Sequence, residues 1–223
     1  MNFLSHYYLS SESKNEYYTL GVLLPDLIPG FTRVNKLKST ATIYTEVEKE
    51  INAGVAFHLR TDAIFHNLAL FNQLNSAVTQ IFSADSNHKI PRSFFLAHVL
   101  VELLIDKFLI EENLSAAQQF YYNLEKIDVV VLNTYLEKIK YLDSNFISRF
   151  DNFKMRRFAF LLDSNENMFQ ALKHICFHRI NFRPTEAEEL LLLVLIKKST
   201  KVVEQEWKNV FKQMQKKLAE YDN

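Results

Sequence analysis

The chain has 223 residues, in which 26 Lys and Arg balance 26 Asp and Glu, and 48% of the residues are hydrophobic. A net charge of zero gives no overall field that attracts nucleic acid or an anionic membrane, so we expect neither as a partner. Three glycines and four prolines are too few for the tight turns of a β-sandwich or for a glycine-rich phosphate loop. Long helices with few connections, an all-α fold, are the expected architecture.

The first half of the chain is predicted to form short helices followed by two long ones. Residues 1–30 indicate short helices with a turn near Pro25 and Pro29, and residues 27–45 indicate a loop that includes part of a helix. Apolar residues then recur at helical spacing, which predicts one long helix from Glu46 or Gly54 to about Phe82. After the turn-rich residues 83–91, a second long helix is predicted from about Arg92 to Ile110.

The second half is also predicted to be helical. Ser115 with Gln118, and Thr185 with Glu188, have the spacing of capping boxes that open helices. Further helices are expected over residues 128–141, 145–163 and 166–180, with a last one to about Glu220. No linker stands out, so we predict a single domain over residues 1–223, built as a multi-helix bundle.

The compartment is predicted from cysteine usage and from the apolar runs. Cys176 is the only cysteine, so no internal disulfide can form, and a reducing compartment is expected. The N-terminus lacks the features of a signal peptide, and the apolar run from Leu190 to Ile196 is far shorter than the roughly 20 residues that cross a bilayer. We therefore expect a cytoplasmic protein.

Two sets of metal-ligand residue types recur every four positions. One set is His58, Asp62 and His66, and the other is His98, Glu102 and Asp106. Residues four apart lie on one face of a helix, so each set would form a column. If the two helices lie side by side, six ligand groups face each other, as in the metal sites of helical bundles.

The surroundings of the second column support a buried polar site. Residues 97–105 are apolar except for His98 and Glu102, which predicts a helix that is buried nearly all round. A buried carboxylate needs a metal, a cation or hydrogen bonds. Mixed histidine and carboxylate ligands suit manganese, iron or zinc. The alternative is that each acid simply pairs with a nearby histidine, in a helical interaction protein whose polar column is structural.

Two further polar residues, His6 and Asp26, each close an apolar stretch near the start of the chain. Each is either a helix cap, a buried hydrogen-bonding residue or part of the same site. His174 and His178 are also four apart, but no carboxylate accompanies them, so we interpret them as surface or core residues.

The order of these motifs resembles the acyl carrier protein phosphodiesterase family. That family has Asn-Phe-Leu-Ala-His, Gly-Asn-Leu-Leu-x-Asp, Gly-x-x-x-His-Arg-x-Ile-Asp and Asp-His-Phe-Leu in the same order. This chain has similar segments at residues 2–6, 21–26, 54–62 and 106–109. The resemblance covers residues 1–110. Beyond them the chain is similar to the family only in being helical.

The resemblance implies an HD-domain-like helical fold that uses a divalent metal, manganese first, with iron or zinc as alternatives. It also implies hydrolysis of the phosphodiester that links 4′-phosphopantetheine to a serine of holo-acyl carrier protein, which makes this carrier protein the expected partner. By resemblance, functional roles fall to a set that comprises His6, Asp26, His58, Asp62 and Asp106. A basic segment with Arg33, Lys36 and Lys38 would suit docking of an acidic carrier protein.

This chain also departs from the family pattern. His66 and Glu102 stand where the family has aspartate, His98 has no counterpart, and Lys107 replaces a histidine. These departures indicate changed metal ligation and leave a different phosphoester as an alternative substrate. The predicted metal ligands are His6, Asp26, His58, Asp62, His66, His98, Glu102 and Asp106. The predicted catalytic residues are Asp26, Asp62, Asp106 and Arg60, of which Arg60 would hold a phosphate.

Overall fold

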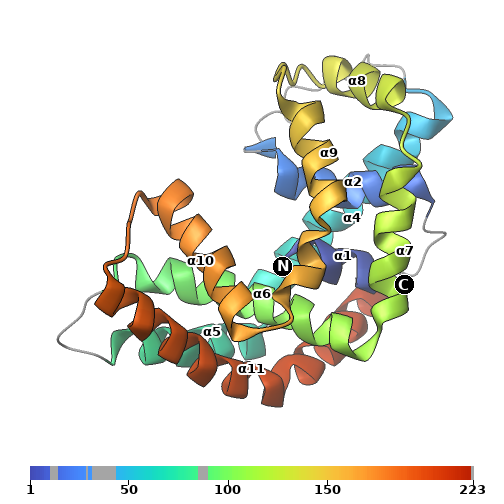
Figure 1. The fold of residues 1–223 in the computed structure, drawn as a ribbon. Coiled ribbons are helices and arrows are strands. Elements are labelled where there is room, and N and C mark those ends of the chain that lie inside the picture. The colour runs from blue at the N-terminus through green and yellow to red at the C-terminus, as the bar shows by residue number, and fades with distance from the viewer. Residues whose placement is uncertain (11–14, 29, 32–43, 85–89, 222–223) are drawn as a thin grey trace. The chain divides into compact units, whose positions relative to one another are not determined.

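A computed structural model describes residues 1–10, 15–28, 30–31, 44–84 and 90–221 (Figure 1). All regular secondary structure in these residues is helical, which confirms the predicted all-α fold class. None of the described helices is both long enough and apolar enough to cross a membrane.

The contacts divide the chain into two compact units, and each unit is built from two separate stretches of sequence. Unit 1 comprises residues 1–63 and 113–158, and unit 2 comprises residues 64–112 and 159–223. The boundary between residues 63 and 64 falls inside a helix, α4 (Glu46–Asn67). The prediction of a single domain over residues 1–223 stays a prediction.

Unit 1 is organised around α7, which contacts α1, α2 and α9. Its helices, besides most of α4, are α1 (Phe3–Leu9), α2 (Glu16–Leu27), α7 (Leu114–Glu125), α8 (Val129–Lys138) and α9 (Phe146–Arg156). Aromatic rings fill the space between α1 and α7: the Phe3 and Phe120 rings stack with centroids 5.6 Å apart, and Tyr7 meets Phe120 edge to face at 5.1 Å. This packing fixes the helix that carries His6.

Helices α2 and α4 cross at two glycines. A Cβ atom added to Gly21 would lie 2.0 Å from the main-chain oxygen of Ile51, and one added to Gly54 would lie 2.2 Å from that of Tyr18. Only a residue without a side chain allows two helix backbones to approach this closely. The crossing sets the position of α2 against the part of α4 that carries His58.

Helix α4 begins with a capping box that was not predicted from the sequence. The Thr45 main-chain nitrogen donates to Glu48 Oε2 at 2.7 Å, and the Glu48 nitrogen donates to Thr45 Oγ1 at 3.3 Å. Glu48 is only 2% exposed, and Lys138 of α8 donates to its carboxylate at 2.7 Å. A buried carboxylate of this kind needs such partners, because an unpaired buried charge is strongly destabilising.

Unit 2 is built on α5 (Ala69–Ser83), α6 (Ser93–Glu112) and α11 (Glu186–Tyr221), each of which contacts the other two. α10 (Asn165–Ile180) contacts α6 and α11 (Figure 1). The Phe108 and Trp207 rings stack at 6.0 Å between α6 and α11. Cys176 is buried in α10, and burial raises the pKa of its thiol to about 11, as expected of an unreactive structural cysteine.

Several predicted element boundaries are wrong, each for a local reason. The long helix predicted to about Phe82 ends at Asn67, because Leu68 adopts an extended backbone before α5 begins. No turn forms at Pro25, which lies in the last turn of α2, where its missing N–H removes only one helical hydrogen bond. Pro29 lies outside the described residues.

The second half of the chain gives two more corrections and one confirmation. Helix α7 is capped by Asn113, whose Oδ1 accepts from the Ala116 nitrogen, and not by the predicted box at Ser115. The helix predicted over 145–163 ends at Arg156, because Arg157 takes a left-handed conformation, and a 3₁₀ helix follows over Phe158–Leu162. The capping box of Thr185 and Glu188 is confirmed at the start of α11.

Candidate functional site

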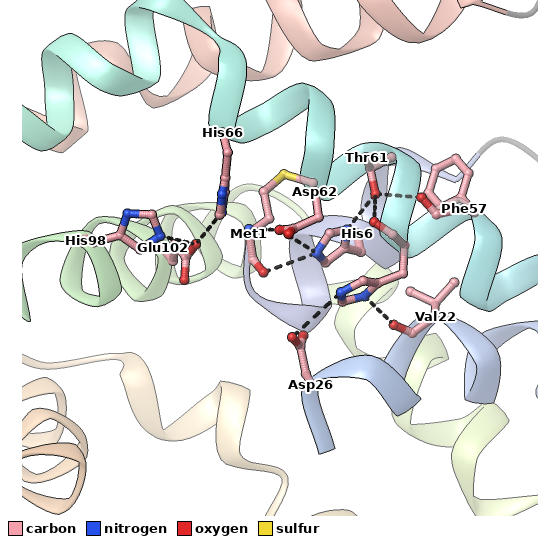
Figure 2. A network of polar contacts seen from close by, with 11 residues as sticks. Met1, His6, Val22, Asp26, Phe57, Thr61, Asp62, His66, His98 and Glu102 are labelled. Carbon is pink, nitrogen blue, oxygen red and sulfur yellow. Dashed lines mark hydrogen bonds and ion pairs between the residues drawn. The ribbon is translucent and has the colours of Figure 1, made fainter. Parts of the chain in front are cut away.

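Three of the predicted ligand residues converge in unit 1, and each comes from a different helix. His6 of α1, Asp26 of α2 and His58 of α4 each offer a ligand atom, and these atoms all lie within 4.8 Å of one another (Figure 2). His6 and His58 are buried, whereas Asp26 is exposed. The group therefore has a buried imidazole side and a solvent-facing carboxylate side.

His58 is held by the close crossing of α2 and α4. Its Nδ1 lies 2.8 Å from the main-chain oxygen of Val22, which can only accept a hydrogen bond, so Nδ1 carries the proton. In the neutral ring this leaves Nε2 as the lone-pair nitrogen, 3.8 Å from Asp26 Oδ1. A carbonyl partner of this kind is how metal-binding histidines are commonly oriented.

His6 is held by the hydroxyl of Thr61. His6 Nδ1 lies 2.7 Å from Thr61 Oγ1, and this hydroxyl has the carbonyls of Phe57 and His58 as acceptors at 2.8 and 2.9 Å. Because the hydroxyl donates to a carbonyl, it accepts from His6 Nδ1 and leaves Nε2 to other partners. Nε2 lies 3.1 Å from the Met1 carbonyl oxygen, which accepts from this nitrogen whenever it carries a proton.

The two imidazole rings stack, with centroids 3.8 Å apart and an angle of 24° between their planes. Two buried cationic rings at this distance would repel each other strongly, because charges interact strongly where water is excluded. The stack therefore favours neutral rings, which is the form that binds metals.

Asp62 lies near this group on α4 but outside it, and Arg60 lies on the same helix. Asp62 Oδ1 accepts from the Met1 amino group at 2.9 Å and lies 4.0 Å from His6 Nε2 (Figure 2). The Arg60 guanidinium lies over the ring of Phe57, with its central carbon 5.5 Å from the ring centroid. Asp62 is thus close enough to act on a molecule bound beside His6.

A second group of three lies in unit 2. His66 comes from the end of α4, and His98 and Glu102 lie one turn apart on α6. Glu102 Oε1 is 3.1 Å from His98 Nε2 and 3.7 Å from His66 Nε2 (Figure 2). The pKa of Glu102 is lowered: burial acts to raise it, and the charge and hydrogen bond of His98 are among the effects that lower it.

Both groups have the donor chemistry of a divalent-metal site. Each offers two imidazoles and one carboxylate, a set that suits zinc, iron and related first-row ions. Two ligand atoms bound to one such ion at tetrahedral angles are roughly 3.4 Å apart, given bond lengths of roughly 2.1 Å. The measured nitrogen–oxygen separations, from 3.1 to 3.8 Å, bracket this value.

Six of the eight predicted ligands are thus found in two groups of three, and Asp62 and Asp106 lie outside both groups. Asp106 is fully buried in α6. His174 and His178 are exposed, and their ring centroids are 4.2 Å apart. The basic segment with Arg33, Lys36 and Lys38 lies outside the described residues, so its docking role stays a prediction.

Sequence reasoning missed the residues that orient the histidines. Thr61 gave no signal for its role, because nothing in the spacing of α4 indicates a partner on α1. The Val22 contact uses a main-chain oxygen, which no side-chain pattern reveals. Gly21 and Gly54 were the available signal, since two glycines in otherwise helical segments indicate a close backbone approach.

No protein-family model, no curated protein and no solved structure matches this chain.

Proposed function

We propose that the protein is a divalent-cation-dependent phosphodiester hydrolase of HD-like fold. The substrate is the phosphodiester that joins 4′-phosphopantetheine to a serine of holo-acyl carrier protein. One observation carries the proposal: His6, Asp26 and His58 converge from three helices, with both imidazoles oriented through Nδ1. The resemblance of residues 1–110 to the acyl carrier protein phosphodiesterases supports the choice of substrate.

The residues fit a cation because two imidazoles and one carboxylate bring their ligand atoms within 4.8 Å of one another. His58 Nε2 faces Asp26 Oδ1, and the Nδ1 partner of each histidine lies on the opposite side of its ring. His6, Asp26 and His58 would hold the ion, and manganese, iron and zinc all accept this donor set. A bound cation would supply positive charge to the phosphoryl oxygens and lower the pKa of water.

Asp62 is the residue best positioned to take a proton during the reaction. Its side chain is 40% exposed, so water reaches it, and it lies 4.0 Å from His6 Nε2. In hydrolysis the water oxygen bonds to phosphorus, the bond from phosphorus to the seryl oxygen breaks, and the serine gains a proton. Asp62 would accept the proton that the water loses, as a general base. The products are the apo carrier protein and 4′-phosphopantetheine.

The test combines metal content with turnover of the carrier protein. We would purify the full chain without a metal-affinity column and measure bound manganese, iron and zinc by mass spectrometry. The wild type would be compared with an Asp26→Asn, His58→Gln variant and with a His174→Gln, His178→Gln control. We expect the first variant to lose one ion per chain and the control to keep it.

Turnover would be read as the mass that holo-acyl carrier protein loses when it becomes the apo form. We expect conversion by the wild type with added manganese and none by the Asp26→Asn, His58→Gln variant. A wild type that binds the ion and cleaves a small phosphodiester, but leaves the carrier protein intact, would support the other-phosphoester alternative. A wild type that binds no ion would contradict the hydrolase proposal and favour an interaction protein.

A further inference from the structure

The group in unit 2 has its own geometry and shares no residue with the group in unit 1. Its three ligand atoms lie within 4.8 Å of one another, and Glu102 Oε1 is near both histidine nitrogens. The His66 side chain is 35% exposed, that of His98 25% and that of Glu102 16%, so the group is largely sheltered from solvent.

Aromatic side chains hold the two imidazoles in place. The Phe71 ring stacks on His66 at 5.7 Å and meets His98 edge to face at 5.3 Å. Phe71 itself is 1% exposed and packs on Phe65 with centroids 4.0 Å apart. The rings are therefore positioned by buried packing, so that little conformational entropy is lost when an ion binds.

We propose that His66, His98 and Glu102 form a second cation site, which binds zinc or a similar first-row divalent ion. Two imidazole nitrogens and one carboxylate oxygen are ligands that zinc accepts, and three protein ligands leave a fourth position for water. Magnesium and calcium are disfavoured, because they prefer sites made of oxygen ligands alone. This proposal does not rest on the proposed hydrolase function.

The bound ion would join the end of α4 to α6 within unit 2. His66 is the last residue but one of α4, and the chain turns at Leu68 into α5. The His66 carbonyl already accepts a hydrogen bond from Asn72 Nδ2 at 3.3 Å, which ties the end of α4 to the first turn of α5. An ion on the His66 side chain adds a link to α6, so it stabilises the folded state by mass action.

The test uses cobalt(II) as a spectroscopic probe and zinc as its competitor. We would work in a His174→Gln, His178→Gln background, so that this exposed histidine pair cannot contribute to the titration. An Asp26→Asn change in the same background removes a ligand of the group in unit 1. Cobalt titrations of the full chain, read by visible ligand-field absorption, then report on the remaining site.

We expect the Asp26→Asn background to bind one cobalt ion, which zinc displaces, and to melt at a higher temperature in zinc. Adding Glu102→Gln and His98→Gln should weaken cobalt binding by about 100-fold or more, since loss of an outer-shell partner alone costs 10–100-fold. It should also abolish the zinc-induced rise in Tm. Glu102→Gln keeps the shape of the side chain, so circular dichroism should show an unchanged helix content.

A background that binds no cobalt, or a Glu102→Gln, His98→Gln variant that binds it unchanged, would overturn the proposal. If that double variant fails to fold, the single change His66→Gln replaces it, and unchanged cobalt binding there has the same meaning. The two proposals fail separately, since the ion of the proposed hydrolase depends on Asp26 and this ion depends on Glu102.

Discussion

Replacing Gly54 by alanine should disturb both the stability of unit 1 and its candidate metal group. The added Cβ would lie 2.2 Å from the Tyr18 oxygen and 2.8 Å from the Val22 nitrogen. Ordinary contact requires about 1 Å more, so α2 and α4 must move apart by about that distance. The His58 Nδ1 to Val22 O distance of 2.8 Å would then approach about 3.8 Å, which is no longer a hydrogen bond.

The expected loss of stability follows from three terms. Overpacking costs about 1–3 kcal/mol, here at the upper end because backbone atoms are the neighbours. The lost buried hydrogen bond costs about 1 kcal/mol. Alanine regains about 1 kcal/mol of helix propensity over glycine. We therefore expect Gly54→Ala to lower the free energy of unfolding by about 2–3 kcal/mol, and Tm by roughly 5–10 °C for a chain of this size.

The assay is urea unfolding together with cation binding by equilibrium dialysis. The control is Ala56→Gly, at an exposed position two residues along the same helix, which should cost about 1 kcal/mol and leave cation binding unchanged. A Gly54→Ala protein as stable as the wild type would refute the close crossing. One that is destabilised but binds cations normally would refute the link from the crossing to His58.

Two further predictions address Thr61 and Glu48. Thr61→Val keeps the side-chain shape but removes the partner of His6 Nδ1, so cation affinity measured by dialysis should fall about 10-fold. Thr61→Ser should retain affinity, and the reverse order would contradict this role. Burial raises the pKa of Glu48, but hydrogen bonds from Lys138 and Thr45 outweigh it, and the net pKa is lowered. Its stabilising contribution is therefore present above the unfolded pKa of about 4.3 and is lost as the pH falls through the folded value. In urea unfolding from pH 7 to about pH 3, wild-type stability should fall more steeply below about pH 5 than that of Glu48→Gln, and parallel curves would contradict the prediction.

The fold class and the positions of most helices could be predicted from the sequence. Helix formation depends on local features, and this chain has few glycines and prolines and has apolar residues at helical spacing. The break at Leu68 could not, because no proline or glycine marks it. There the chain leaves the helix so that α5 can lie against α6 and α11, which is a tertiary effect. Pro25 led to the opposite error, because a proline often marks a turn. A proline in the last turn of a helix removes only one helical hydrogen bond, so α2 continues past it.

The candidate ligands were identified by residue type and spacing, but their grouping was not. His58, Asp62 and His66 are spaced four apart on α4, as predicted, and the spacing fixes only that they share a face of one helix. What each side chain meets depends on other elements: His58 meets α2, Asp62 meets the amino group of Met1, and His66 meets α6. Residues spaced four apart on one helix, α4, therefore contribute ligands to two different groups.

The same reasoning explains why Glu102 and Asp106 differ although they lie one turn apart on α6. Glu102 is near two histidine nitrogens, and its side chain is 16% exposed. Asp106 is fully buried and belongs to neither three-residue group. Burial in an apolar helix was the argument for assigning both residues to a metal. It establishes only that each carboxylate needs a partner, and the choice between an ion and another protein group depends on which histidines the neighbouring helices bring within reach.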